Sequence, residues 1–291
     1  MSYANEVLHR IFVRPVRRFD DGSRAVRERL ERRSPCMIAR FGATEIKAVV
    51  LPLLPRPLQG LLRNRFSERL RLYSGVFPSG EASLRRFAAL MEEDTRELDI
   101  LGSWRAEEAL LWPQLRGVEL VPLPALEPYF SATPWSAALE GMKVLVVHPF
   151  TNTIESQYRN HRHHLFQDER ILPQFKSLAL LQAVQSIAGT PTRFKDWFEA
   201  LDWMKEQINT IDFDVALIGC GAYGFPLAAH VKRLGKIGIH LGGATQLLFG
   251  IRGKRWDDNK ALARHVNEYW VRPSAEETPP QARIVENACY W

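Results

Sequence analysis

The chain has 291 residues, a net charge of +6, 46% hydrophobic residues and 25% charged residues, a mix typical of globular proteins rather than disordered or fibrous ones. Its three cysteines, Cys36, Cys220 and Cys289, lie far apart, which argues against a disulfide framework and a cysteine-rich zinc site. Glycines and a proline interrupt the longest charge-free stretch, residues 215–231, and no secretory signal is visible, so we expect a cytoplasmic protein.

Much of the positive charge is concentrated near the N-terminus, where we expect residues 1–33 to form an extension that is helical after Asp21. Arginines of this kind either pair with carboxylates on a solvated helix face or bind an anionic partner. A phosphorylated ligand and a peripheral contact at the inner face of the membrane are both open, whereas nucleic acid is not expected because no binding motif accompanies the charge. The arginines are Arg10, Arg14, Arg17, Arg18, Arg24, Arg27, Arg29, Arg32 and Arg33.

The elements predicted in the first half are short. We expect a buried strand over residues 36–40 and a helix over 44–54 that Pro55 ends. Apolar residues at helical spacing predict two further helices, and two short apolar runs are strand candidates. A proline- and aromatic-rich stretch, residues 123–135, is typical of a loop. The helices cover residues 61–72 and 82–97, and the strand candidates cover 99–101 and 117–121.

The second half alternates strands and helices more regularly, which predicts βαβ units and a mostly parallel sheet. We therefore expect residues 34–272 to form one Rossmann-like α/β domain, with helices on the flanks of the sheet. Residues 273–291 read as an irregular tail whose aromatic end packs back on the domain. The expected strands are 143–147, 177–185, 214–218 and 237–240, and the expected helices begin at 153, 196, 223 and 244.

A glycine motif follows one of these strands and opens the next helix. Gly219, Gly221 and Gly224, with Tyr223 between them, fit the pattern G-x-G-x-x-G. Such glycines let backbone N–H groups approach a phosphate at the positive end of a helix, although a tight turn with close packing gives the same pattern. The next strand ends at His240 instead of an acid for the ribose, so we expect no NAD and favour a mononucleotide or a nucleotide-diphosphate sugar.

Two further features of the second half favour a phosphate ligand. Gly242, Gly243 and Gln246 form a second glycine turn after a neighbouring strand, at the sheet edge where α/β proteins bind ligands. Lys254 and Arg255 belong to a cationic loop that can neutralise a diphosphate, or that is a solvated charge run.

The segment at the end of the first predicted strand contains one cationic and one acidic side chain. These are Arg40 and Glu45 in the sequence RFGATE, where the arginine could hold a phosphate and the glutamate a divalent cation. The alternative for Glu45 is an ordinary position in the first turn of a helix.

At this point the sequence resembles a known family. RFGATE is similar to the RFGDGE segment of the GT-D type glycosyltransferases, and residues 215–243 are similar to the glycine-turn region near the end of those domains. The latter run, with LLFGIRGKRW and the terminal CYW, also resembles uncharacterised proteins of bacterial surface-polysaccharide clusters. The resemblance extends over about residues 35–256 and implies a nucleotide-sugar donor, a glycan or lipid-linked acceptor, and hexosyl transfer.

Residue by residue, the resemblance covers two sets of positions and departs from the first motif at Ala43 and at Thr44, where the motif has its central glycine. Arg40, Gly42 and Glu45 match the first motif, in which the family's second carboxylate, a presumed metal contact, is Glu45. Ala43 stands where the motif has aspartate, so Mn²⁺ or Mg²⁺ would be held more weakly and by the substrate phosphates in part. Metal dependence, and activity itself, therefore stay open. The nucleotide-side turn is matched by Gly219, Gly221 and Gly224.

Two other residues are catalytic candidates beside Glu45. His148 follows a predicted strand and could act as a base, bind phosphate or be structural. Glu127 lies among aromatic residues and could be a base beside a sugar-stacking surface, unless those aromatics belong to the core. The leading hypothesis is a glycosyltransferase of surface polysaccharide or glycoconjugate assembly. The alternatives are a non-catalytic nucleotide or sugar-phosphate-binding protein of the same fold, or another nucleotide-dependent transferase.

Overall fold

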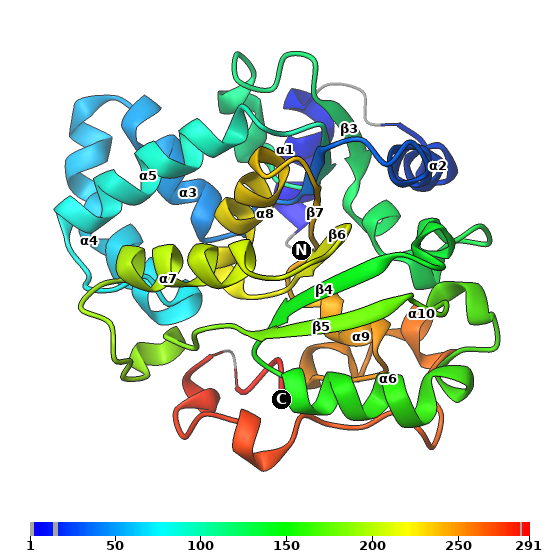
Figure 1. The fold of residues 1–291 in the computed structure, drawn as a ribbon. Coiled ribbons are helices and arrows are strands. Elements are labelled where there is room, and N and C mark those ends of the chain that lie inside the picture. Colours follow the sequence, from blue (N-terminus) through cyan, green and yellow to red (C-terminus); the bar gives the residue numbers. More distant parts are fainter. Residues whose placement is uncertain (1–2, 14–16, 286) are drawn as a thin grey trace.

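The computed structural model describes residues 3–13, 17–285 and 287–291, and its centre is one seven-stranded sheet in which every strand is parallel (Figure 1). The spatial order is β3-β2-β1-β7-β6-β4-β5. The predicted α/β class and the parallel sheet are confirmed. The strands are β1 (Cys36–Ala39), β2 (Ile100–Ser103), β3 (Glu119–Pro122), β4 (Lys143–His148), β5 (Ser177–Gln182), β6 (Val215–Ile218) and β7 (Ile237–His240).

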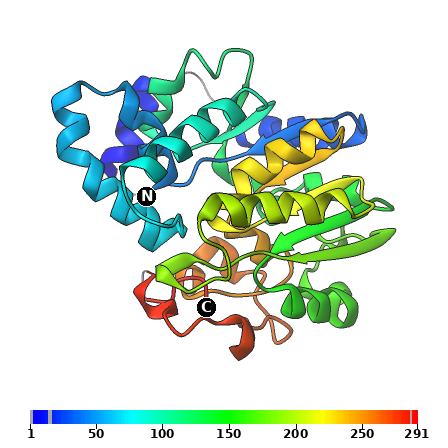
Figure 2. The ribbon, with the colours of Figure 1, turned by 60° about the vertical axis from the view of Figure 1, so that its left-hand side comes forward.

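Helices cover both faces of the sheet (Figure 2). Short 3-10 turns fill most of the remaining connections. The helices are α1 (Tyr3–Phe12), α2 (Phe19–Glu31), α3 (Glu45–Val50), α4 (Arg56–Ser74), α5 (Glu81–Thr95), α6 (Thr151–Leu165), α7 (Trp197–Asn209), α8 (Gly224–Arg233), α9 (Ala244–Leu248) and α10 (Lys260–Ala263).

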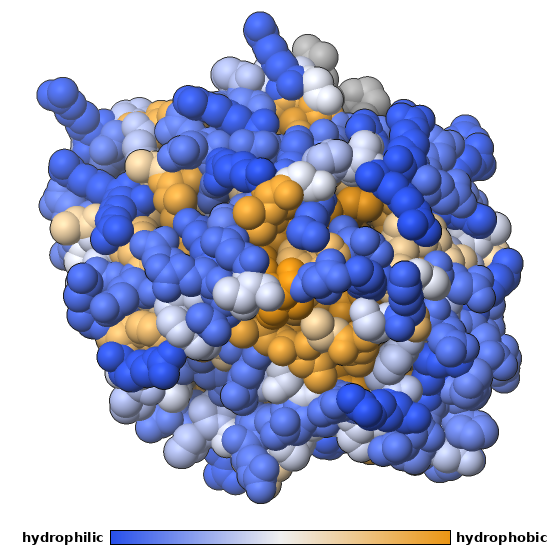
Figure 3. Space-filling view, viewed as in Figure 1, coloured by the Kyte–Doolittle hydropathy of each residue, from blue (hydrophilic) through white to orange (hydrophobic). Residues whose placement is uncertain are grey.

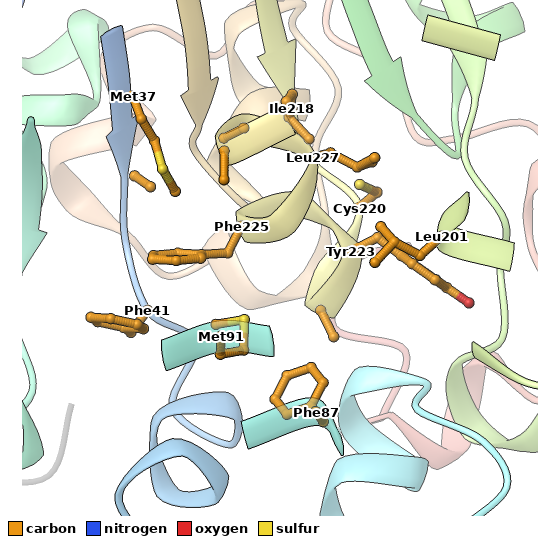
Figure 4. Packing of buried hydrophobic residues seen from close by; sticks show 14 of the residues in the cluster. Met37, Phe41, Phe87, Met91, Leu201, Ile218, Cys220, Tyr223, Phe225 and Leu227 are labelled. Carbon is orange, nitrogen blue, oxygen red and sulfur yellow. The ribbon is translucent and has the colours of Figure 1, made fainter. Parts of the chain in front are cut away.

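The core has two layers because successive strand residues point to opposite faces of the sheet. Met37 and Ala39 of β1 pack with helices α3, α5, α7 and α8, whereas Cys36 and Ile38 pack on the other face with α2, α6 and α9. In the first layer Phe41, just after β1, stacks on Phe225 of α8 with ring centroids 4.8 Å apart (Figure 4). On the face seen in Figure 1, apolar residues gather over the middle and hydrophilic side chains surround them (Figure 3).

Two aspartates fix the register of neighbouring strands. The Asp99 carboxylate accepts a hydrogen bond from the backbone of Met37 at 2.8 Å, and the Asp214 carboxylate accepts one from Lys143 at 2.8 Å. Each aspartate directly precedes one strand and accepts a hydrogen bond from the backbone at the start of the neighbouring strand in the sheet. This structural role favours aspartate at both positions.

The structure differs from the sequence prediction mainly at the N-terminus. Helix α1 was not predicted, and α2 begins at Phe19 instead of after Asp21. Helix α1 is short, but its sequence is strongly amphipathic, so the pattern by which a surface helix is recognised was available. The predicted helix 44–54 ends earlier, at Val50, and a 3-10 turn, Leu51–Leu53, follows it.

The strand order creates a crevice at the carboxyl edge of the sheet. From β4 the chain crosses to β5 on one side and then returns to β6 on the other side of β4, and β1 likewise lies between β2 and β7. Loops that leave neighbouring strands in opposite directions open a space for ligands there. Within the described ranges, no helix has both the length and the hydropathy that a membrane span requires.

Candidate functional site

A cavity of about 590 Å³ lies at the carboxyl edge of β1, β7, β6 and β4. Each of these strands contributes the residue that follows it or ends it to the lining: Arg40, His240, Gly219 and His148. The volume is within the range of small-molecule sites, roughly 300–1,000 Å³. The cavity therefore occupies the position that the strand order predicts for a ligand.

Most of the residues predicted from the sequence meet in this cavity. Glu127, Gly224 and Lys254 are not among the lining residues. The predicted residues that do line it, from both halves of the chain, are Arg40, Gly42, Glu45, His148, Gly219, Gly221, Tyr223, Gly242, Gly243, Gln246 and Arg255.

The two glycine turns lie side by side because β6 and β7 are neighbours. Gly221 and Gly242 have φ angles of 59° and 64°, in the left-handed region that favours glycine. At Gly219 an added Cβ would lie 2.7 Å from the carbonyl oxygen of Gly242, so only glycine lets the turns approach this closely. Gly224 makes room for His240, since a Cβ at position 224 would overlap the imidazole of that histidine.

Cationic side chains dominate one side of the cavity. The Arg40 guanidinium lies over the Trp104 ring, 4.8 Å from its centroid, and Arg255 donates a hydrogen bond to the Tyr290 hydroxyl at 3.0 Å. Burial lowers the pKa of Arg40, and Glu45 acts in the opposite direction. The guanidinium still stays protonated, because arginine does not lose its proton in proteins. The cavity therefore offers fixed positive charge to an anionic ligand.

Glu45 begins α3 and folds back over Gly42. A Cβ on Gly42 would overlap the Glu45 carboxylate, so the glycine makes room for the acid. Among the described residues that line the cavity, Glu45 has the one side-chain carboxylate. Three lining residues have guanidinium groups: Arg40, Arg105 and Arg255.

This donor set does not fit a divalent cation held by the protein alone. Magnesium and manganese favour several oxygen ligands, and the described residues hold no group of three or more His, Cys, Asp or Glu side chains suited to a metal. The arginines can supply the positive charge that a diphosphate needs, so we assign no step to a metal ion.

His148 and His240 are neutral side chains with one ring nitrogen engaged. The backbone N–H of Phe150 donates to Nδ1 of His148 at 3.0 Å, which places the His148 proton on Nε2. His240 Nδ1 lies 3.3 Å from the Ile218 carbonyl and donates to it, which leaves Nε2 as an acceptor. Burial lowers the pKa of both histidines to about 3, aided at His240 by Arg40. One histidine therefore presents a hydrogen-bond donor and the other an acceptor.

The lowered pKa of His148 predicts a loss of stability in acid. Its ordinary pKa is 6.5, so between about pH 5.5 and pH 4 the unfolded chain holds a proton that the folded chain does not, and stability falls as the pH falls. His148→Asn removes this contribution, and its asparagine oxygen can still accept from Phe150. We expect the free energy of unfolding, measured by urea titration, to vary by about 1.4 kcal/mol per pH unit less in the variant than in the parent.

The control for this experiment is Gln182→Asn at the exposed end of β5, because this change removes no titrating group. It should leave the pH dependence close to that of the parent. Equal slopes for His148→Asn and the parent would show that His148 titrates alike in the folded and unfolded chains.

The other predicted residues have mainly structural contacts. Tyr223 stacks on Trp197, with ring centroids 4.8 Å apart, and its hydroxyl lies 3.0 Å from the Ser186 hydroxyl. Gln246 donates to the carbonyl of Tyr290 at 3.0 Å. Glu127 accepts a hydrogen bond from the Tyr129 hydroxyl at 2.7 Å, and burial raises its pKa.

The C-terminal tail supplies lining residues that the motifs did not indicate. Val285, Tyr290 and Trp291 line the cavity, and the backbone N–H groups of Lys254 and Arg255 donate to tail carbonyls at 3.2 and 2.9 Å. The prediction that the aromatic end packs back on the domain is confirmed. Its contribution to the cavity could have been suspected only from its aromatic composition.

Two other lining residues were also missed as site residues. His240 ends a predicted strand, and this position at a carboxyl strand end was the available signal. Trp104 follows β2, and its indole N–H donates to the carbonyl of Phe41 at 2.8 Å, a contact across 63 positions that the sequence does not reveal.

Comparison with known proteins gives one family-level result. Residues 136–248 match the family model described as the GT-D fold-like domain. No curated protein and no solved structure matches the chain. The matched residues run from just before β4 to the end of α9 and so include both glycine turns and His148, but they do not include the RFGATE segment. The match to residues 136–248 indicates a glycosyltransferase-like fold for this part of the chain.

Proposed function

We propose that this protein is a glycosyltransferase that uses a nucleotide-diphosphate sugar as donor. The observation that carries the proposal is the cavity in which two glycine turns face the guanidinium groups of Arg40 and Arg255. The GT-D-like fold supports it, since that fold implies binding of a sugar donor in general. A glycan or lipid-linked sugar is the acceptor we propose, and the aromatic rings of Tyr73, Trp104 and Trp291 offer it apolar surfaces.

In this proposal the diphosphate lies against the turns at Gly219–Gly221 and Gly242. Backbone N–H groups and the two arginines hold its oxygens, because guanidinium groups match the geometry of phosphate. As the bond from the sugar to the diphosphate breaks, negative charge grows on the leaving oxygen. Fixed donors in a partly desolvated cavity stabilise that charge more than water does.

The remaining polar groups suit the sugar. His148 offers the Nε2–H donor to a phosphate or hydroxyl oxygen, and His240 Nε2 can accept a hydrogen bond from a hydroxyl. Glu45 is then the acid–base candidate, since among the described lining residues no other side chain is a carboxylate. It would accept the proton of the acceptor hydroxyl as that oxygen attacks the anomeric carbon.

A second candidate is a protein that binds the same donor without transferring the sugar. Ala43 at the position of the motif aspartate favours it, because the cavity is left with a single carboxylate among its described lining residues. Both candidates predict donor binding, and only the enzyme predicts turnover.

Donor binding and donor hydrolysis, measured together, separate the two. We expect UDP- or GDP-sugars to bind more tightly than CMP-sugars, which carry a single phosphate, and to be hydrolysed with EDTA present. Glu45→Gln should lower turnover by about 100-fold with little change in donor affinity. Glu140→Gln, at an exposed position, is the matched control.

The outcomes differ clearly. Binding without turnover under any metal condition would favour the non-catalytic protein. Turnover that survives Glu45→Gln would remove Glu45 from the chemistry, and failure of every nucleotide sugar to bind would contradict both candidates.

A further inference from the structure

Helix α1 packs with its polar side against the protein. The Asn5 side chain donates to the Trp104 carbonyl at 2.9 Å and accepts from the backbone of Ala106 at 3.3 Å. One turn later, His9 Nε2 lies 2.7 Å from the Ser103 hydroxyl. These contacts fix the rotation of α1 about its axis.

Apolar side chains elsewhere around α1 face solvent. Ile11 and Phe12 are 64% and 63% exposed, and Val7 and Leu8 are 37% and 44% exposed. A surface helix ordinarily buries its apolar side chains and exposes its polar ones. Helix α1 therefore departs from the usual orientation, since Ile11 and Phe12 are mostly exposed.

Neighbouring elements add to these exposed apolar side chains. The 3-10 turn Ala106–Leu111 contacts both α1 and α3, and α4 packs on α3, so these elements are joined side by side (Figure 2). Leu61 of α4 is 75% exposed. We call the exposed apolar residues of these elements the apolar face. They are Val7, Leu8, Ile11, Phe12, Leu53, Leu58, Leu61 and Leu110, most of the exposed large hydrophobic residues described.

Three cations stand beside the apolar face, together with the acid Glu107, which pairs with Arg105. Arg65 and Arg69 lie one turn apart on α4, and together with Lys47 and Leu110 they border one surface depression. Burial lowers the pKa of Lys47, Glu107 acts in the opposite direction, and the arginines nearby, Arg105, Arg69 and Arg65, lower it further. None of the three forms an ion pair with a carboxylate among the residues that the structure describes.

The arginines of α2 differ in this respect. Arg24, Arg27 and Arg32 each lie near an acid of their own helix, at 3.6, 2.7 and 3.8 Å. They form the solvated, paired helix face that was one of the two expectations for the N-terminal arginines. Arg17 pairs with Glu119 at 2.8 Å, and Arg14 lies outside the described residues.

We propose that the apolar face docks on an anionic lipid bilayer, with Lys47, Arg65 and Arg69 against the headgroups. Exposed aliphatic and aromatic side chains bordered by cations are the pattern of helices that lie in the membrane interface. A second copy of this chain fits less well, because a twofold contact would bring the same cations together. Helix α4 also contributes to the cavity through Tyr73, and Trp104, whose carbonyl accepts from Asn5 of α1, lines it as well. The proposal stands whether or not the cavity transfers a sugar.

Co-sedimentation of the full chain with vesicles tests this docking. We expect binding to vesicles of phosphatidylcholine that contain about 30% phosphatidylglycerol. Binding to vesicles of phosphatidylcholine alone should be at least about tenfold weaker. Ile11→Asp with Phe12→Asp should weaken binding to the anionic vesicles at least about tenfold, since the apolar contact is lost. Arg65→Glu with Arg69→Glu should do the same and should reduce the dependence on salt.

Each control variant makes the same kind of substitution as a test variant, at a position outside the apolar face. Leu234→Asp replaces an apolar residue that is 39% exposed at the C-terminal end of α8, and Arg24→Glu with Arg32→Glu reverses two cations of α2. Both should bind as the parent does, and circular dichroism should show all variants folded. Equal binding to the two lipid mixtures, or no effect of the α1 and α4 variants, would overturn the proposal. Concentration-dependent dimers that the same variants abolish would assign the apolar face to a second copy instead.

Discussion

Replacement of Arg40 by methionine should lower turnover of the sugar donor by about 100-fold or more, the loss typical when one preformed donor to a developing charge is removed. Arg40 follows β1 directly, and its guanidinium lies over the Trp104 ring inside the cavity. Methionine keeps the apolar stem against Trp104 and removes the charge. Glu45 loses the cation that offsets its charge, so the effect should exceed that of deleting a surface arginine.

Two further variants make this result interpretable. Arg40→Lys keeps the charge but loses the planar pair of donors, and it should fall between the parent and Arg40→Met in turnover. Arg116→Met, at an exposed position, should behave as the parent. The measurements are donor affinity by calorimetry and the rate of nucleotide release. If Arg40→Met keeps both, Arg40 does not contact the diphosphate.

The second large effect concerns stability. Glu277 belongs to the C-terminal tail and is 3% exposed. Its side chain lies against the N-terminal end of α6. Its carboxylate accepts hydrogen bonds from the backbone N–H of Asn152 at 2.8 Å and of Thr153 at 3.3 Å, and from the Thr153 and Ser274 hydroxyls. A carboxylate there also interacts favourably with the positive end of the helix.

Glu277→Ala should therefore lower the free energy of unfolding by about 3 kcal/mol, because it leaves several buried donors without an acceptor. Glu276→Ala, at the exposed neighbouring position, should change it by less than about 0.5 kcal/mol. Urea titration followed by tryptophan fluorescence measures both. Equal stability of the two variants would show that the tail is not anchored through Glu277.

The tail variant also has a functional consequence. The indole N–H of Trp291 donates to the backbone carbonyl of Glu277 at 3.2 Å, and Trp291 lines the cavity. Release of this segment should open one side of the cavity. We expect weaker donor binding by Glu277→Ala even under conditions in which the variant remains folded.

The strands and the glycine turns could be predicted because their signals are local. Runs of β-branched residues such as 143–147 indicate buried strands, and glycines directly after a strand indicate a tight turn. Parallel strands end at one edge, so Arg40 and Glu45 could be expected near Gly219 although they lie in the other half of the chain.

The rest depends on tertiary contacts that leave little trace in the sequence. The rotation of α1 is set by Asn5 and His9 binding residues about a hundred positions away, against the usual preference for buried apolar residues. The tail adds Tyr290 and Trp291 to the cavity through backbone carbonyls, which any residue type possesses. Glu127 was also a catalytic candidate, but the Tyr129 hydroxyl donates to its carboxylate and it does not line the cavity.

A crystal structure of the protein with a bound nucleoside diphosphate tests the central claim most directly. The account predicts that the diphosphate lies against the turn at Gly219–Gly221, within hydrogen-bonding distance of Arg40 or Arg255 and facing the Nε2–H of His148. A diphosphate bound elsewhere on the molecule, with this cavity left to solvent, would contradict it.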